Sequence, residues 1–256
     1  MVEKQPDFQV SLATTKEEVR AAQSLRYEVF VEEMGASGPL VDHKKKLEKD
    51  HFDPFCDHLL VQEVSTGRLA GVYRLMRGDQ AEAAGGFYSD SEYDHSALKA
   101  SERRLLELGR SCLDADFRGG PALFHLWNGL ADYVKQHEIE ILFGVASFPG
   151  VNLAELAEPL TLLQREYSAP QDLISRSKTY QSMELMGDAQ PDRKRAMLSM
   201  PALIKAYLRL GGAVGDGAFV DREFNTTDVC LILDTSKMNT RQRRMYVGQK
   251  QVAQCP

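Results

Sequence analysis

The chain lacks the features that mark an exported, disulfide-stabilised or membrane-spanning protein. Its 256 residues contain only four cysteines, which are scattered and form no Cys-x-x-Cys pair, so neither a disulfide framework nor a zinc site is indicated. No run of about 18 uncharged apolar residues offers a membrane span, and the first residues lack the apolar stretch of a signal peptide. We therefore expect a cytoplasmic protein with buried free thiols and no bound metal.

Charge is unevenly spread. The formal net charge is -6, yet the tail formed by residues 237–256 carries five basic side chains and no acidic one. A basic tail of this kind is typical of contact with anionic lipid, here peripherally at the inner membrane, or with an acidic protein partner. A solvated terminus is the alternative. We expect no nucleic-acid partner.

Helical and strand patterns alternate along the chain. Thr15 and Glu18 form a capping box that opens a predicted helix over residues 16–33. Residues 58–64 and 69–76 predict an antiparallel hairpin. A strand over 103–113, a helix over 121–137 and a strand over 139–147 predict a parallel crossover unit. Further helices are expected over 154–165 and 201–210, and strands over 213–221 and 228–234.

These elements predict a single α/β domain over residues 1–256, with a mixed central sheet flanked by helices on both faces in three layers. The core covers about 8–150 and 200–236, a helical insertion about 151–199, and the basic tail 237–256. The order resembles the GCN5-related N-acyltransferase (GNAT) fold. The resemblance implies that the strands over 103–113 and 139–147 diverge and hold the pantetheine arm of an acyl donor between them.

Charged side chains suggest a ligand site in the first half of the chain. Arg26, Phe30 and Glu33 share one helix face, apart from the apolar stripe, and predict a ligand-facing wall. An exposed ion pair is the alternative. Asp50 and Asp53 place two carboxylates close together and suggest an ammonium site, or simply turn capping.

The strand over 103–113 carries the candidate base. Gly109 predicts a bulge that brings Glu107 and Arg110 to the same side, although three positions apart in a regular strand they would face opposite ways. Arg74, in the middle of a predicted strand, should meet a carboxylate of a ligand, of Glu107 or of Asp53, because an unpaired buried guanidinium is costly.

A helix start next to this strand suggests a phosphate site. Arg118, Gly119 and Gly120 offer a cation and exposed N–H groups at the start of the helix, unless the segment is a plain junction. Pro121 lacks the N–H that a pyrophosphate loop would use, so a donor with a single phosphate fits better than coenzyme A. That donor is the phosphopantetheine of acyl carrier protein, an acidic partner.

Two family resemblances follow from longer motifs. Four motifs together resemble acyl-homoserine-lactone synthases: residues 25–30, Asp50-x-x-Asp53, Gly71-x-x-Arg74 and Glu107-x-x-Arg110. Motifs spread over most of the chain are similar to the L-ornithine Nα-acyltransferases of ornithine-lipid synthesis, often labelled hemolysin-like: residues 107–112, 142–144, 147–150, 203–211 and 221–228.

The second resemblance implies transfer of a 3-hydroxyacyl chain from acyl carrier protein to the α-amine of L-ornithine, giving lyso-ornithine lipid, with no bound cofactor. In this interpretation Glu107 is the general base. Arg26, Arg74 or Arg110 binds the substrate carboxylate, and Asp50 or Asp53 binds its side-chain ammonium. The alternatives are a synthase of acyl-homoserine-lactone type, another N-acyl amino acid synthase, and a non-catalytic module that binds acyl carrier protein or lipid.

Overall fold

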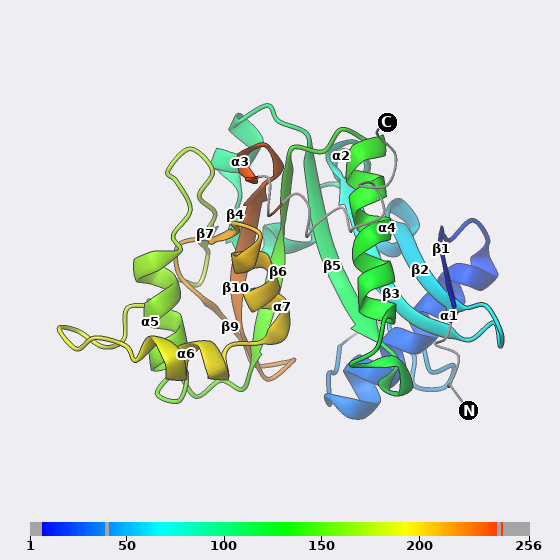
Figure 1. Ribbon diagram of the computed structural model, residues 1–256, viewed down its shortest axis with the longest axis horizontal. Helices are drawn as coiled ribbons and strands as arrows, with labels where there is room; N and C mark the ends of the chain where they lie inside the picture. The colour runs from blue at the N-terminus through cyan, green and yellow to red at the C-terminus, as the bar shows by residue number, and fades with distance from the viewer. Residues whose placement is uncertain (1–6, 39–40, 240–241, 243–256) are drawn as a thin grey trace, which may run out of the picture. The chain divides into compact units, whose positions relative to one another are not determined.

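The computed structural model describes residues 7–38, 41–239 and 242. Its strands are β1 (Phe8–Leu12), β2 (Asp57–Glu63), β3 (Leu69–Arg77), β4 (Tyr93–Asp94), β5 (Leu105–Leu113), β6 (Ile141–Pro149), β7 (Arg176–Ser177), β8 (Ala213–Val214), β9 (Phe219–Asp221) and β10 (Thr226–Asp234). Its α-helices are α1 (Lys16–Arg26), α2 (Gly78–Ala84), α3 (Ser96–Ala100), α4 (Ala122–Gln136), α5 (Ala157–Glu166), α6 (Arg193–Ser199) and α7 (Ala202–Arg209) (Figure 1).

Within the described residues, the main sheet has eight strands, hydrogen-bonded in the order β1-β2-β3-β5-β6-β10-β8, with β9 also paired to β10. The hairpin of β2 and β3 is antiparallel, and β5 pairs with β6 in parallel, as predicted. Strand β1 is missing from the predicted elements. The sheet is therefore mixed, as expected for the fold class.

The chain folds as two compact units. Unit 1 comprises the described residues up to Ala84 together with Leu108–Glu138, and unit 2 comprises Gly85–Glu107 and the described residues from Ile139 onward. Strand β5 contributes to both. The predicted organisation into one domain with a core, an insertion and a tail stays a prediction, and most of the basic tail lies outside the described residues.

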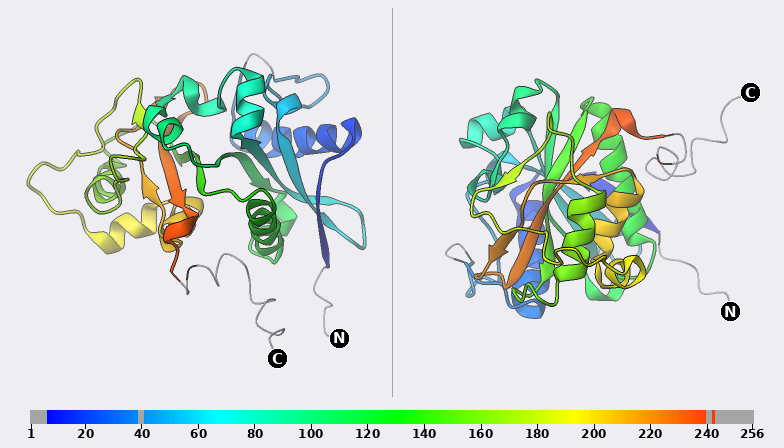
Figure 2. Two further views of the ribbon diagram at one scale, coloured as in Figure 1. Left: turned by 90° about the horizontal axis from the view of Figure 1, so that it is seen from above. Right: turned by 90° about the vertical axis from the view of Figure 1, so that its left-hand side faces the viewer.

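Helices cover both faces of the sheet in unit 1 (Figure 2). Leu60 and Val72 join the apolar residues of α1 in one buried cluster, whereas Leu59, the neighbour of Leu60 on β2, meets α4 at Gly129. Successive strand residues point to opposite faces, so α1 and α4 lie on opposite sides of the sheet. A Cβ on Gly129 would lie 2.4 Å from Val10 Cγ1, which explains why a glycine lets α4 approach β1 closely.

The predicted helix over 16–33 is continuous but changes its winding. The capping box of Thr15 and Glu18 opens α1 as expected, and after Arg26 the chain continues as a π-helix over Tyr27–Glu33. Extra residues per turn rotate the later side chains away from the positions that a regular α-helix gives them. The spacing that placed Arg26, Phe30 and Glu33 on one face therefore does not apply.

In unit 2, β10 pairs with β6 over its whole length and α7 packs against β10. The segment 151–199 is helical only at its two ends, in α5 and α6, which contact each other. The segment between these two helices contains the two-residue strand β7, which pairs with β4. None of the described helices has the length and apolarity needed to cross a membrane.

Candidate active site

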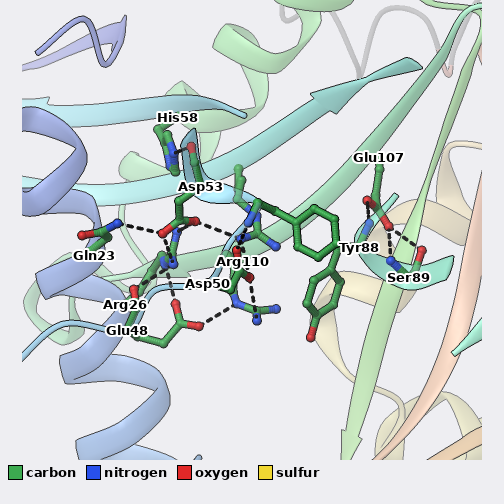
Figure 3. A network of polar contacts seen from close by, with 12 residues as sticks. Gln23, Arg26, Glu48, Asp50, Asp53, His58, Tyr88, Ser89, Glu107 and Arg110 are labelled. Carbon is green, nitrogen blue, oxygen red and sulfur yellow. Dashed lines mark hydrogen bonds and ion pairs between the residues drawn. The ribbon is translucent and has the colours of Figure 1, made fainter. Parts of the chain in front are cut away.

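A buried network of charges occupies unit 1 (Figure 3). Its members come from α1, from the loop before β2, from β3 and from the second half of β5. Three guanidinium groups meet three carboxylates in it: Arg26, Arg74, Arg110, Glu48, Asp50 and Asp53. The formal charges balance, which is the condition under which buried ions are tolerated.

Arg26 lies at the centre of the network and is fully buried. Its Nε donates to Glu48 Oε2 at 2.5 Å, and its Nη1 and Nη2 donate to the two carboxylate oxygens of Asp53 at 2.9 and 3.0 Å. The bidentate geometry is the strongest form of this contact. Arg26 therefore ties α1 to the loop that carries both acids.

Arg74 meets Asp53, as its position in the middle of a strand predicted. Its Nη1 donates to Asp53 Oδ1 at 2.9 Å and to Asp50 Oδ2 at 2.6 Å. Arg110 donates through Nε to Glu48 Oε1 at 3.0 Å. The side chain of Arg110 is 14% exposed, against 4% for Arg74 and 1% for Arg26, so Arg110 is the most accessible of the three.

The electrostatics of the network favour its charged form. Burial alone would raise the pKa of Asp53, but Arg26 and Arg74 lower that pKa below its usual range. The pKa of Asp50 is likewise lowered by Arg74 and Arg110 against the effect of burial. Burial lowers the pKa of His58, whose Nε2 lies 3.1 Å from the backbone carbonyl of Asp53.

The bulge predicted at Gly109 stays a prediction, and the irregular backbone of β5 is found at the next residue. Arg110, not Gly109, has a left-handed backbone, with a φ of 54°. A non-glycine residue held in this region costs roughly 1 kcal/mol or more, and such residues concentrate at functional sites. From this backbone, the Arg110 side chain donates to Glu48 and Asp50.

Phe30 and Glu33 do not form the predicted wall with Arg26. Phe30 packs against the apolar cluster between α1 and the sheet, so its expected separation from the apolar stripe is wrong. Glu33 is exposed and accepts two hydrogen bonds from Arg118, at 2.7 and 2.9 Å. Of the three, only Arg26 belongs to the buried network.

The predicted phosphate segment lies at the start of α4. Pro121 is the N-cap residue of that helix, and Gly119 has a φ of 73°, which glycine adopts without strain. Arg118 is 43% exposed and is held by Glu33. An exposed pair of this kind contributes less than about 1 kcal/mol, so a phosphate could replace Glu33 as the partner of Arg118.

Glu107 lies in unit 2 and is buried. Its Oε2 accepts a hydrogen bond from the backbone N–H of Tyr88 and its Oε1 accepts one from that of Ser89, both at 2.8 Å. The Ser89 hydroxyl also donates to Oε1 (Figure 3). Glu107 pairs with Phe143, and it is the last residue of β5 in the parallel register with β6.

Several contact residues are absent from the predicted site. Glu48, Tyr88 and Ser89 are found only through the fold, since a carboxylate two residues before Asp50 and a short Tyr-Ser turn carry no specific sequence signal. The roles predicted for the other residues stay predictions.

Comparison with known proteins identifies the family. Residues 25–128 match the family described as acetyltransferase (GNAT) domain. An L-ornithine Nα-acyltransferase of Rhodobacter capsulatus is 53% identical over 244 residues, which are 93% of this chain and 94% of that protein.

Two solved structures share the fold. One is FeeM, an N-acyl amino acid synthase from uncultured soil microbes, with a TM-score of 0.54 and 12% identity over 93% of this chain and 98% of FeeM. The other is BjaI, a CoA-dependent acyl-homoserine lactone synthase, with a TM-score of 0.51 and 14% identity over 93% of this chain and 85% of BjaI. Because the identity to the Rhodobacter protein extends over nearly the whole of both chains, this protein belongs to the family of L-ornithine Nα-acyltransferases.

Proposed function

We propose that the protein transfers a 3-hydroxyacyl chain from acyl carrier protein to the α-amine of L-ornithine and so makes lyso-ornithine lipid. The observation that carries this proposal is the 53% identity to an L-ornithine Nα-acyltransferase over 93% of the chain. The GNAT domain supports the reaction class.

The reaction requires a neutral amine. Its nitrogen attacks the thioester carbonyl carbon, and a tetrahedral intermediate forms. The carbon–sulfur bond then breaks, and the proton lost by the nitrogen passes through a base to the leaving thiolate. We assign Glu107 as the base, because three donors hold its carboxylate in a fixed orientation.

The buried network supplies the proposed acceptor groups. Arg110 is our ligand for the substrate carboxylate, since it is the most accessible guanidinium and presents a planar fork. Asp50 is our ligand for the side-chain ammonium, because its side chain is 13% exposed whereas that of Asp53 is 3% exposed. Arg26, Arg74 and Asp53 then act as the framework that orients these two.

Acyl carrier protein is the proposed donor. Support comes from Arg118 and Gly119 at the start of α4 and from Pro121, which removes one N–H where a pyrophosphate would need several. BjaI is CoA-dependent, so acyl-coenzyme A is the donor to compare. The same acyl chain, supplied on each carrier at equal concentration, separates the two. We expect faster thiol release from acyl carrier protein.

We also propose peripheral contact with the inner membrane through the basic tail, because the acylated product is a lipid and the tail is cationic. Vesicles with and without anionic lipid test this contact. We expect sedimentation only with anionic vesicles and its loss when residues 240–256 are removed. Sedimentation unchanged by that removal would contradict the role of the tail.

The decisive experiment is a panel of acceptors. Purified full-length protein is incubated with 3-hydroxyacyl carrier protein and ornithine, lysine, glutamine or S-adenosylmethionine, while free carrier thiol and product mass are followed. We expect thiol release and acylated product with ornithine. If product forms only with another acceptor, the protein is a different N-acyl amino acid synthase. If the protein binds the carrier without releasing thiol, it is a non-catalytic module.

A further inference from the structure

A chain of buried hydrogen bonds extends from Glu107 into unit 2. The Ser89 hydroxyl, which donates to Glu107, lies 2.9 Å from His95 Nε2. On the other side of the ring, His95 Nδ1 lies 2.8 Å from the hydroxyl of Ser175. Ser89, His95 and Ser175 are each at most 1% exposed. None of the predicted site residues except Glu107 belongs to this chain.

The proton positions in the chain follow from counting donors. A serine hydroxyl has one hydrogen, and that of Ser89 is used by Glu107. Nε2 of His95 must then carry the proton and donate to Ser89, which leaves Nδ1 as the acceptor for Ser175. Every donor in the chain therefore points toward the carboxylate of Glu107.

The surroundings fix the imidazole ring and keep it neutral. Phe143, the register partner of Glu107, packs edge-on against the ring at 5.0 Å, and Tyr93 stacks on it at 6.1 Å. Burial lowers the pKa of His95 to about 4, although neighbouring charges act on it in both directions. Asp90 and Asp94 raise that pKa, whereas Lys99 and Lys178 lower it.

The turn that carries Ser89 is built to present its donors. Gly86, with a φ of 145°, precedes a 3-10 helix over Tyr88–Ser91, and Asp90 fixes the turn by accepting from the Phe87 N–H at 2.8 Å. A Cβ on Gly86 would lie 2.7 Å from Asp90 Oδ2. The two amide donors to Glu107 therefore come from a backbone whose geometry is set locally.

We propose that His95 is a positioning residue for the acyl transfer, which acts through Ser89 to orient Glu107 and to set its affinity for a proton. The proposal rests on the role of Glu107 as base. Donors to a carboxylate stabilise its charged form, so removing one of them makes the group protonate at higher pH. A residue that only supports the fold would instead lower activity equally at all pH values.

The test is the pH profile of kcat/KM for ornithine in the full-length protein. In Ser89→Ala, which loses one charged hydrogen bond, we expect the acid limb to move up by about one pH unit, with the high-pH plateau kept. His95→Leu should move it in the same direction. His95→Gln should stay near the wild type, since its amide nitrogen can replace the Nε2 donor.

Ser91→Ala is the matched control. Its hydroxyl lies in the same turn but donates to the Tyr88 carbonyl, so its profile should not move. Unmoved acid limbs in Ser89→Ala and His95→Leu, together with an inactive Glu107→Gln, would overturn the role of His95 and leave the base assignment standing. Full activity of Glu107→Gln would instead reject the base itself.

A second measurement does not depend on turnover. Nitrogen-15 NMR of histidine-labelled protein at neutral pH reports which ring nitrogen of His95 carries the proton, with His95→Gln identifying the signal. We expect a protonated Nε2 and an unprotonated Nδ1. The opposite tautomer would overturn the proposal, because Ser89 could not then donate to Glu107 while receiving a proton from the ring.

Discussion

Single residues in the buried network differ in what they contribute. Arg26, Arg74 and Asp53 are almost inaccessible and bond one another, whereas Arg110 and Asp50 keep part of their surface exposed. We therefore expect the first three to determine stability and the last two to determine how the acceptor binds.

Asp53→Asn tests the stabilising role. The substitution removes the negative charge between Arg26 and Arg74, and breaking a buried pair in this way costs about 3–5 kcal/mol. Denaturant unfolding measures the loss. The control is Asp116→Asn, which removes an acid that is 70% exposed beside Arg68 and should cost far less stability. Equal losses would mean that the network is not a stabilising framework.

Arg110→Gln and Arg118→Gln test the proposed division of substrate binding, in which Arg110 binds the acceptor and Arg118 binds the acyl donor. We expect Arg110→Gln to raise KM for ornithine by roughly tenfold or more, because a charged hydrogen bond to a carboxylate contributes about 1.5–3 kcal/mol. Arg118→Gln should raise KM for the acyl donor only. If the two variants raise the same KM, the division between acceptor and donor groups is wrong.

At the scale of elements, the close approach of α4 to the sheet depends on Gly129. Gly129→Ala places a Cβ 2.4 Å from Val10 and 3.3 Å from Leu59, so we expect a loss of about 1–3 kcal/mol from overpacking. Gly78→Ala, at the start of α2, meets no atom within 4 Å and serves as the control in the same thermal unfolding series. A neutral Gly129→Ala would show that α4 can shift away at no cost.

The sequence predicts most regular elements because their signals are local. The capping box at Thr15, the hairpin of β2 and β3 and the crossover around α4 all match the structure. Strand β1 was not predicted, because its five residues give only a short alternation of apolar and polar side chains. The long loop between α5 and α6 carries no periodicity, so its path depends on tertiary contacts that no local pattern encodes.

The sequence predicts only part of the site. Arg74 and Asp53 meet as expected, because a buried charge must find its counter-charge. The placement of Phe30 and Glu33 fails because the π-helix changes the spacing of side chains. His95 and Ser175 are 80 residues apart in the chain, and only the folded sheet brings such residues together.

For the whole molecule, stability should fall as the pH is lowered from neutral. The folded pKa of His95 is about 4 and that of His58 is also lowered, so the unfolded chain takes up protons first below about pH 6.5. Proton uptake by His95 in the unfolded chain then lowers the free energy of unfolding by about 3 kcal/mol between pH 6.5 and 4. Asp53 has a lowered pKa, so its contribution is present above about pH 4 and is lost below it.

Urea unfolding across this pH range measures the effect. His95→Gln removes the titrating ring, so the slope of unfolding free energy between pH 6.5 and 4 should become markedly flatter than in the wild type. Ser91→Ala changes a side chain that does not titrate in this range, so it is the control and should keep the slope of the wild type. An unchanged slope in His95→Gln would mean that His95 is not held neutral by the fold.

The most consequential step of the proposed mechanism is the acceptance, by the carboxylate of Glu107, of the proton lost by the attacking amine. Its most direct test is the turnover of Glu107→Gln with 3-hydroxyacyl carrier protein and ornithine, followed as free thiol from pH 6 to 9. Glutamine keeps the size of the side chain but cannot act as the base, so we expect turnover to fall by about 10²-fold or more at every pH. Turnover equal to that of the wild type across this range would contradict the account.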